Sequence, residues 1–212
     1  MNIQAELRCR CGEVRALVRD PSPKTVNRVV CYCDDCQAFA HRLGRSDLLD
    51  VHGGTDVVQV APASLTFVHG QDKIEAVRLS PKGLYRWYAR CCNTPVGNTL
   101  TPSVPFVGVV AHAFEADGQN PDALFGRPVG AILGKFAIGD VPAKTKKISF
   151  PLLLRALRLV LGWRFTGKTW PHPFFERGSG APRYPVTVLS REQRDALRPL
   201  CGPRPQTLTS VQ

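Results

Sequence analysis

The chain has 212 residues, of which 43% are hydrophobic and 21% charged, as expected of a folded globular protein with a real core. No apolar run approaches the ~20 residues that a bilayer-spanning helix needs, which argues against an integral membrane protein. The first residues lack the apolar stretch of a signal peptide, so we expect a cytoplasmic protein. The length is that of one domain, or of one domain with a substantial appendage.

The formal net charge of +11 belongs almost entirely to the C-terminal third of the chain. Residues 142–212 contain 13 of the 28 Lys and Arg residues but only three of the 17 Asp and Glu residues. The first 141 residues are therefore nearly neutral. A nucleic-acid or acidic partner is thus a hypothesis for the C-terminal third only.

Short strands separated by turns dominate the first 110 residues. The strands that we predict are Glu13–Val18, Asn27–Cys31, Leu65–His69, Ile74–Leu79, Leu84–Tyr88 and Phe106–Val110. The segment Asp34–Leu43 is typical of a helix, with Asp34 able to cap its first turn. The sequence therefore predicts a mainly β, mostly antiparallel domain with one short helix after the second cysteine motif.

Residues 111–149 show no regular pattern. The sequence after them predicts a helical, basic C-terminal extension. Pro151–Gly162 is apolar around most of a helix, and we favour docking on the β domain over a membrane-surface or partner-binding helix. A further short helix is predicted at Arg191–Leu197. We divide the chain into a zinc-binding β domain (1–140), a helical extension packed on it (141–178) and a Pro/Arg-rich, partly disordered tail (179–212).

Seven of the eight cysteines fall in three tight groups, and Cys201 stands apart. Clustered cysteines in a reducing compartment are more often metal ligands or catalytic thiols than disulfides. Zinc takes four soft ligands, and a C-x-C or C-x-x-C unit supplies two of them from one turn. The groups are Cys9-x-Cys11, Cys31-x-Cys33-x-x-Cys36 and Cys91-Cys92. They predict zinc binding, with thiol redox chemistry as the alternative.

The middle group differs from the other two because it offers three thiols within six residues. Cys36 lies at the start of the predicted helix, whose N-terminus favours the thiolate. A zinc held by three protein thiolates keeps a fourth position open for water or substrate, which is the catalytic pattern. The outer groups each lie at a strand end and could meet in space to form a structural site.

The order CxCG, CxCxxC and then a cysteine pair before Thr94 covers residues from about 5 to 110 and resembles the glutathione-dependent formaldehyde-activating enzyme family. That resemblance implies a β-tent fold of small antiparallel sheets around one structural and one catalytic-type Zn²⁺. It also implies a carbon–sulfur lyase acting on an adduct of a glutathione-like thiol with a small aldehyde. By resemblance, the structural ligands are Cys9, Cys11 and Cys92, and the catalytic-type ligands are Cys31, Cys33 and Cys36.

The third motif departs from that family, whose usual pattern is CxxCGT. The first cysteine of that pattern would fall at Ala89, and Cys91 is the obvious substitute. Adjacent side chains on an extended chain point to opposite faces, so three outcomes are open. Cys91 could complete the structural site through a distorted turn, or its thiol could point toward the second site. In the third outcome the structural site lacks a fourth ligand. We favour the first.

Other candidate site residues have an ordinary structural interpretation as well as a functional one. In His52-Gly53-Gly54-Thr55-Asp56, His52 or Asp56 could handle protons near the second zinc, or the segment is a simple glycine turn. His41 is more typical of a surface or packing histidine than of a fourth ligand. The aromatic loop 170–175 either caps the core or lines a pocket.

Two functions therefore follow from the sequence. The first is a zinc-dependent carbon–sulfur lyase-like enzyme with Cys31, Cys33, Cys36 and His52 at its active site and a small-molecule thiol or thiol–aldehyde adduct as its substrate. The second is a non-catalytic zinc module whose basic C-terminal region binds nucleic acid or an acidic partner.

Overall fold

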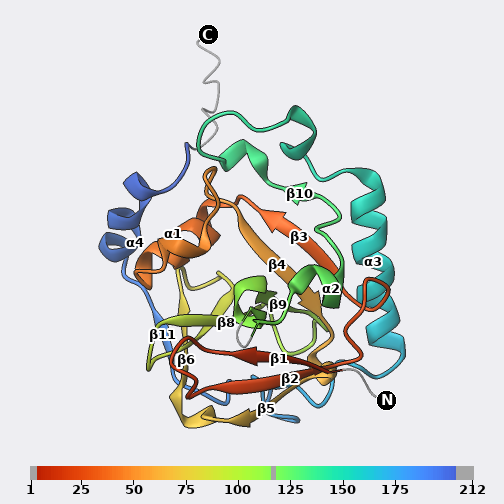
Figure 1. The fold of residues 1–212 in the computed structure, drawn as a ribbon. Helices are drawn as coiled ribbons and strands as arrows, with labels where there is room; N and C mark the ends of the chain where they lie inside the picture. The colour runs from red at the N-terminus through yellow and green to blue at the C-terminus, as the bar shows by residue number, and fades with distance from the viewer. Residues whose placement is uncertain (1–3, 116–117, 204–212) are drawn as a thin grey trace.

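The computed structural model describes residues 4–115 and 118–203, and its strands form two sheets (Figure 1). The smaller sheet is antiparallel and has the order β1 (Gln4–Arg8), β2 (Arg15–Arg19), β5 (Leu65–His69). The larger sheet has eight strands in the order β10 (Ala131–Ile132), β3 (Asn27–Cys31), β4 (Thr55–Val60), β9 (Val107–Val110), β8 (Thr94–Thr99), β7 (Tyr85–Ala89), β6 (Ile74–Arg78), β11 (Val186–Val188). Its two edge strands pair in parallel, β10 with β3 and β11 with β6, and its other pairs are antiparallel.

The α-helices of the described residues are α1 (Asp34–Arg42), α2 (Pro121–Phe125), α3 (Phe150–Phe165) and α4 (Arg191–Leu197), and short 3₁₀ turns occur elsewhere along the chain. In Figure 1, α1 and α4 lie on the left side of the molecule, α3 lies on the right side, and α2 lies between them. Among the described residues, none of the helices is long and apolar enough to cross a membrane. The chain is therefore mainly β with two sheets and a few helices, which agrees with the predicted fold class at that level.

Local sequence patterns predicted the positions of several helices and strands accurately. β3, β5 and α4 have the predicted bounds, and α1 and α3 lie within a few residues of theirs. The tail predicted from residue 179 contains β11 and α4, and its residues 204–212 lie outside the described part.

The predicted cap of α1 was wrong. The N-cap residue is Cys33, whose Sγ accepts a hydrogen bond from the Cys36 N–H at 3.3 Å. Asp34 is instead the first helical residue, and its carboxylate pairs with Arg198 far along the chain. A sulfur atom can fill the capping position because it accepts from the same orphan amide that an Asp oxygen would.

The strand β8 was missed because its sequence, TPVGNT, contains Pro95 and Gly97. The glycine suits the packing, since a Cβ at position 97 would lie 3.1 Å from the Phe174 ring, closer than most Cβ contacts. This close contact lets the aromatic loop lie directly on the strand.

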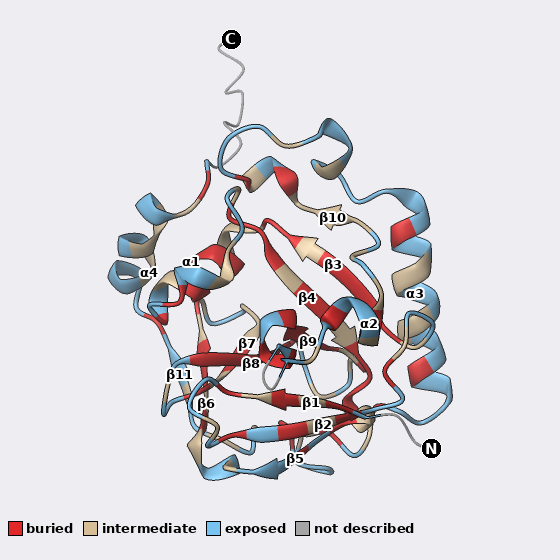
Figure 2. Cartoon of the chain, in the orientation of Figure 1, coloured by how far each residue is buried: buried red, intermediate tan, exposed pale blue. Residues whose placement is uncertain are grey.

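The aromatic loop 170–175 fills the core, which decides between the two predicted roles. Phe174 and Phe175 are fully buried. The Phe174 ring stacks on Trp87 with centroids 4.7 Å apart, and Phe175 meets Trp87 edge-on at 5.8 Å. Buried residues of both sheets belong to the same core cluster, so these rings help to join the two sheets (Figure 2).

We predict that Phe174→Ala lowers the free energy of unfolding by about 3–5 kcal/mol, because it removes a fully buried ring that the surroundings cannot replace. Phe165→Ala is the matched control, since that ring is 83% exposed, and it should change stability by less than about 0.5 kcal/mol. Urea denaturation followed by circular dichroism measures both. Equal effects of the two substitutions would contradict this account of the core.

Candidate metal centres

The first cysteine cluster lies where two hairpin turns from different sheets meet. Cys9 and Cys11 lie in the turn between β1 and β2, and Cys91 and Cys92 lie in the turn between β7 and β8. Residues Gly12 and Asn93 have positive φ angles of 83° and 55°, which turn the chain sharply beside each cysteine pair. The cluster therefore connects the three-stranded sheet to the eight-stranded sheet.

The four sulfur atoms have the spacing of a tetrahedral metal site. All four Sγ atoms lie within 4.8 Å of one another. The Sγ–Sγ distances are 3.5 Å for Cys9–Cys11, 3.3 Å for Cys11–Cys91 and 3.9 Å for both Cys9–Cys91 and Cys91–Cys92. Zn–S bonds of about 2.3 Å in a tetrahedron require sulfur atoms roughly 3.8 Å apart. This donor set and spacing suit Zn²⁺.

Cys91 lies in this cluster, although an extended chain would have turned it away from Cys92. Residues 90–93 form a turn, and the Cys92 N–H donates to the Ala89 carbonyl at 3.3 Å. The rule that neighbouring side chains alternate applies to strands, and Ala89 is the last strand residue of β7. Ala89 is itself fully buried in the core, where a small side chain fits.

Thr94 orients the Cys92 sulfur. The Thr94 Oγ1 accepts from the Arg10 N–H at 3.1 Å and from Arg45 Nη1 at 3.2 Å. Both lone pairs of the hydroxyl are then engaged, so its proton donates to Cys92 Sγ at 3.2 Å. Arg45 is only 2% exposed and also pairs with Asp47. Thr94 therefore stabilises Cys92 in its thiolate form.

The thiols of this cluster differ in acidity. Burial alone would raise the pKa of Cys92, but hydrogen bonds from Thr94 and Cys11 outweigh it and lower that pKa to about 6. Burial and a hydrogen bond to Cys11 raise the pKa of Cys91, and burial chiefly raises the pKa of Cys9. The negative charge of a Cys92 thiolate itself helps to raise the pKa values of Cys9 and Cys91, as expected for like charges in contact.

The second cluster lies at the junction of β3 and α1. Cys31 is the last residue of β3, Cys33 caps α1 and Cys36 is in the first helical turn. Their Sγ atoms lie within 4.8 Å of one another, with Cys36 and Cys31 3.8 Å apart. Within residues 4–115 and 118–203, the cluster has these three thiols and no His, Asp or Glu ligand. Zn²⁺ suits this set as well, with one coordination position left over.

A buried arginine faces the second cluster. Arg86, on β7, is 1% exposed, and its Nη1 lies 3.6 Å from Cys36 Sγ. Hydrogen bonds from Cys31 and Cys33, together with the Arg86 guanidinium, lower the pKa of Cys36 well below its usual value. The pKa of Cys31 is raised by its hydrogen bonds to the other two thiols and by burial. Three thiolates around a divalent cation have a net charge of −1, which Arg86 balances.

A small cavity of about 10 Å³ borders Cys36 and has room for about one water molecule. It is lined by Arg86, Thr55 and Asn98 among others. The Thr55 Oγ1 and Asn98 Oδ1 atoms are buried without a hydrogen-bond partner. Buried polar groups are normally paired, so these two atoms mark a place for a small polar molecule.

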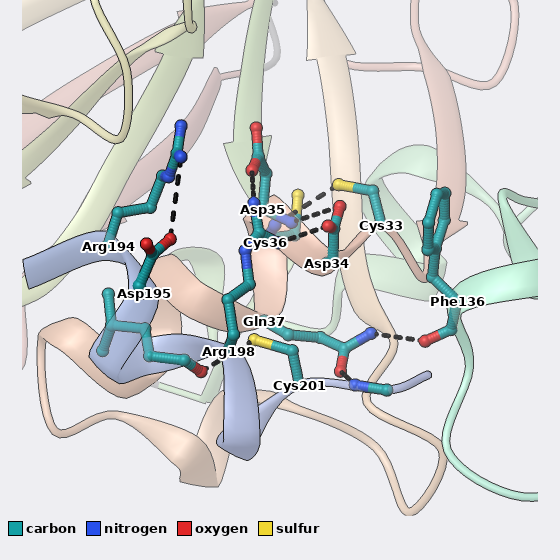
Figure 3. A network of polar contacts seen from close by, with 12 residues as sticks. Cys33, Asp34, Asp35, Cys36, Gln37, Phe136, Arg194, Asp195, Arg198 and Cys201 are labelled. Atoms are coloured by element: carbon teal, nitrogen blue, oxygen red, sulfur yellow. Dashed lines mark hydrogen bonds and ion pairs between the residues drawn. The ribbon is translucent and has the colours of Figure 1, made fainter. Parts of the chain in front are cut away.

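The C-terminal segment holds the helix that contains Cys36 (Figure 3). Arg198 pairs with Asp34 and lies 3.8 Å from Asp35. The Gln37 side chain donates to Phe136 O at 2.9 Å and accepts from the Gly202 N–H at 2.7 Å. Because Asp34 and Asp35 put negative charge beside the thiols, Arg198 and Arg86 are needed to offset it.

The remaining candidates have structural partners. His52 Nδ1 donates to Ile138 O at 2.9 Å, because a carbonyl only accepts. The Asp56 carboxylate is held by the buried Arg28 at 2.7 Å. Gly54 is required by packing, since a Cβ there would lie 2.5 Å from Asp50 and 2.6 Å from Tyr32. His41 belongs to neither cluster.

Sequence reasoning missed Arg86, Arg45 and Arg198, which surround the two clusters. Each is remote in sequence from the cysteines that it serves, and no local motif marks it.

Comparisons with known proteins add a family and a distant structural neighbour. A crystal structure of a Rhodobacter sphaeroides protein, solved in a structural genomics programme, is 19% identical and covers 56% of this chain and 94% of its own, with a TM-score of 0.39. The comparison with curated proteins gives no match. A family model matches residues 1–184, a span that contains both cysteine clusters. The chain belongs to this family of unknown function, DUF6151.

Proposed function

We propose that the chain binds two Zn²⁺ ions, a structural one at Cys9, Cys11, Cys91 and Cys92 and a second one at Cys31, Cys33 and Cys36. The observation that carries this proposal is the convergence of seven thiols into two groups, one of four and one of three. Four thiols close a tetrahedral site, whereas three leave one position open. The way in which the first cluster joins the two sheets also supports the β-tent fold that the family resemblance implies.

We further propose that the second site acts on an adduct of a glutathione-like thiol with a small aldehyde, as a carbon–sulfur lyase. In that reaction the carbon–sulfur bond of a hydroxymethyl thioether breaks, the carbonyl forms, and the hydroxyl proton ends on the thiol. A zinc ion held by three thiolates would supply a Lewis-acidic position for a substrate sulfur or oxygen. This activity rests on the resemblance of the cysteine motifs and on the open position.

The residues beside the second cluster, together with the proposed proton acceptor His52, have roles that agree with this reaction. Arg86 balances the charge of the thiolates. Thr55 and Asn98 offer unpaired polar atoms beside Cys36 that suit a hydroxymethyl oxygen or a water molecule. His52 is held by Ile138 O at Nδ1, which leaves its Nε2 as an acceptor for a proton.

One observation favours the second candidate, a non-catalytic zinc module. Cys31 and Cys36 are buried, and Val57, Ile132 and Leu133 pack around them. The cavity beside Cys36 holds about one water molecule and not a peptide thiol. A substrate of that size does not fit this cavity, so turnover is the direct way to separate the two candidates.

We predict two zinc ions per chain, and one for Cys91→Ser, because a serine hydroxyl is a poor zinc ligand and three thiols from two separate turns hold the ion weakly. Elemental analysis of dialysed protein measures this. Cys201→Ser is the matched control and should keep both ions, since Cys201 lies outside both clusters and its thiol donates to Leu197 O. Unchanged zinc content in Cys91→Ser would remove Cys91 from the first site.

We predict that Arg86→Met weakens zinc binding at the second site by about 10–100-fold, because it leaves the charge of the thiolates unbalanced in a buried place. Titration with a chromophoric chelator measures both affinities, and the first site should be unaffected. Arg28→Met is the control for a lost buried arginine, because Arg28 bonds Asp56 and Asp122 rather than a thiol. If both variants weaken the second site equally, charge balance by Arg86 is not the cause.

The proposed reaction is tested by aldehyde release from S-hydroxymethylglutathione with zinc-loaded protein. We expect turnover that Cys33→Ser abolishes together with one zinc ion, because that thiol is a proposed ligand of the second site. Cys201→Ser should retain both zinc and turnover. Two bound zinc ions without turnover, and without heat from glutathione binding, would favour the non-catalytic candidate.

A further inference from the structure

The helix α3 is fixed on the β domain by a small part of its surface. Leu152 and Trp163 are its buried residues. The Arg155 side chain reaches back to the segment before β3, where it donates to Pro23 O, to Val26 O at 3.0 Å and to Asn27 Oδ1 at 3.1 Å. The helix lies along one side of the molecule, near β3 and β10, and most of its length is exposed or half-buried (Figures 1 and 2).

The outward face of α3 is apolar. It presents six large side chains at positions i, i+3, i+4, i+7, i+11 and i+15, which lie in one strip along a helix. Phe150 and Phe165, at the two ends, are 74% and 83% exposed. The strip runs the ~24 Å length of a 16-residue helix. Its residues are Phe150, Leu153, Leu154, Leu157, Leu161 and Phe165.

Positive charge surrounds this strip. Residues 141–175 contain seven Lys and Arg residues and neither Asp nor Glu. Apart from Arg155, all of them are exposed, and they lie on the helix and on the segments that lead into and out of it. They are Lys144, Lys146, Lys147, Arg158, Arg164 and Lys168. A groove of about 500 Å³ beside the helix adds Lys24 to this set and is also lined by Leu154 and Arg158.

We propose that the outward face of α3 docks on an anionic phospholipid bilayer, with its apolar strip at the level of the upper acyl chains and the surrounding Lys and Arg side chains on lipid phosphates. An apolar strip bordered by cations and free of acids is the pattern of a helix that lies in the membrane interface. A second copy of the chain is a poorer occupant, because pairing the two strips would bring two sets of cations together without acids to offset them. The same face then brings the zinc domain to a membrane surface without spanning it.

Sedimentation with vesicles tests this with the full, zinc-loaded chain. We expect binding to phosphatidylcholine vesicles that contain roughly 30% phosphatidylserine, weaker binding to phosphatidylcholine alone, and loss of binding as salt rises. Leu157→Glu should reduce the affinity for the anionic vesicles roughly tenfold or more, because it puts a carboxylate in the centre of the strip. Val51→Glu is the matched control, since Val51 is 87% exposed and lies outside α3, and it should bind as the unmodified chain does.

Zinc content and circular dichroism, unchanged in both variants, establish that they are folded. No binding of the unmodified chain to anionic vesicles overturns the proposal. Equal binding by Leu157→Glu also overturns it, since the interaction would then be general attraction to polyanions. Sedimentation velocity covers the remaining case: a dimer that Leu157→Glu dissociates, without vesicle binding, would assign the strip to an interface between copies.

Discussion

Four thiols from two hairpin turns lie close enough to share one ion, and the rest of the structure depends on that contact. Cys9 and Cys91 are separated by 82 residues in the chain, yet their Sγ atoms are 3.9 Å apart. One turn belongs to the three-stranded sheet and the other to the eight-stranded sheet. A bound ion would therefore act as a cross-link between the sheets, and cross-links that close long loops remove the most entropy from the unfolded chain. Without a cation, the same contact brings like charges together.

Charge balance links the second cluster to the rest of the molecule. The turn that supplies Cys33 and Cys36 also contains Asp34 and Asp35, so thiolates there need compensation from outside. It comes from Arg86 on β7 and from Arg198 near the end of the described chain. Part of the positive charge of the C-terminal third is thus used inside the molecule, in ion pairs with the acids of this turn. Most of its exposed remainder lies on α3 or on the segments next to it, and the site chemistry does not account for these cations.

The sequence predicted the grouping of the cysteines well because ligand spacing within one turn is a local property. It also predicted β3, β5 and α4, whose patterns are uninterrupted. It left three outcomes open for Cys91 and favoured the structural site, because the alternation rule assumes an extended chain and a turn around Asn93 replaces that chain here. β8 was missed because Gly97 serves the Phe174 ring, a contact between residues far apart in the chain. For the same reason the arginines around the clusters carry no local signal.

The central claim is that each cluster holds one zinc ion through sulfur. X-ray absorption spectroscopy at the zinc edge tests it directly on protein purified without added metal other than zinc. The account predicts two ions per chain with a first shell dominated by sulfur at about 2.3 Å, and a minor oxygen or nitrogen contribution from the open position of the second site. A first shell dominated by oxygen or nitrogen at about 2.0 Å, or fewer than two sulfur ligands per ion, would contradict it.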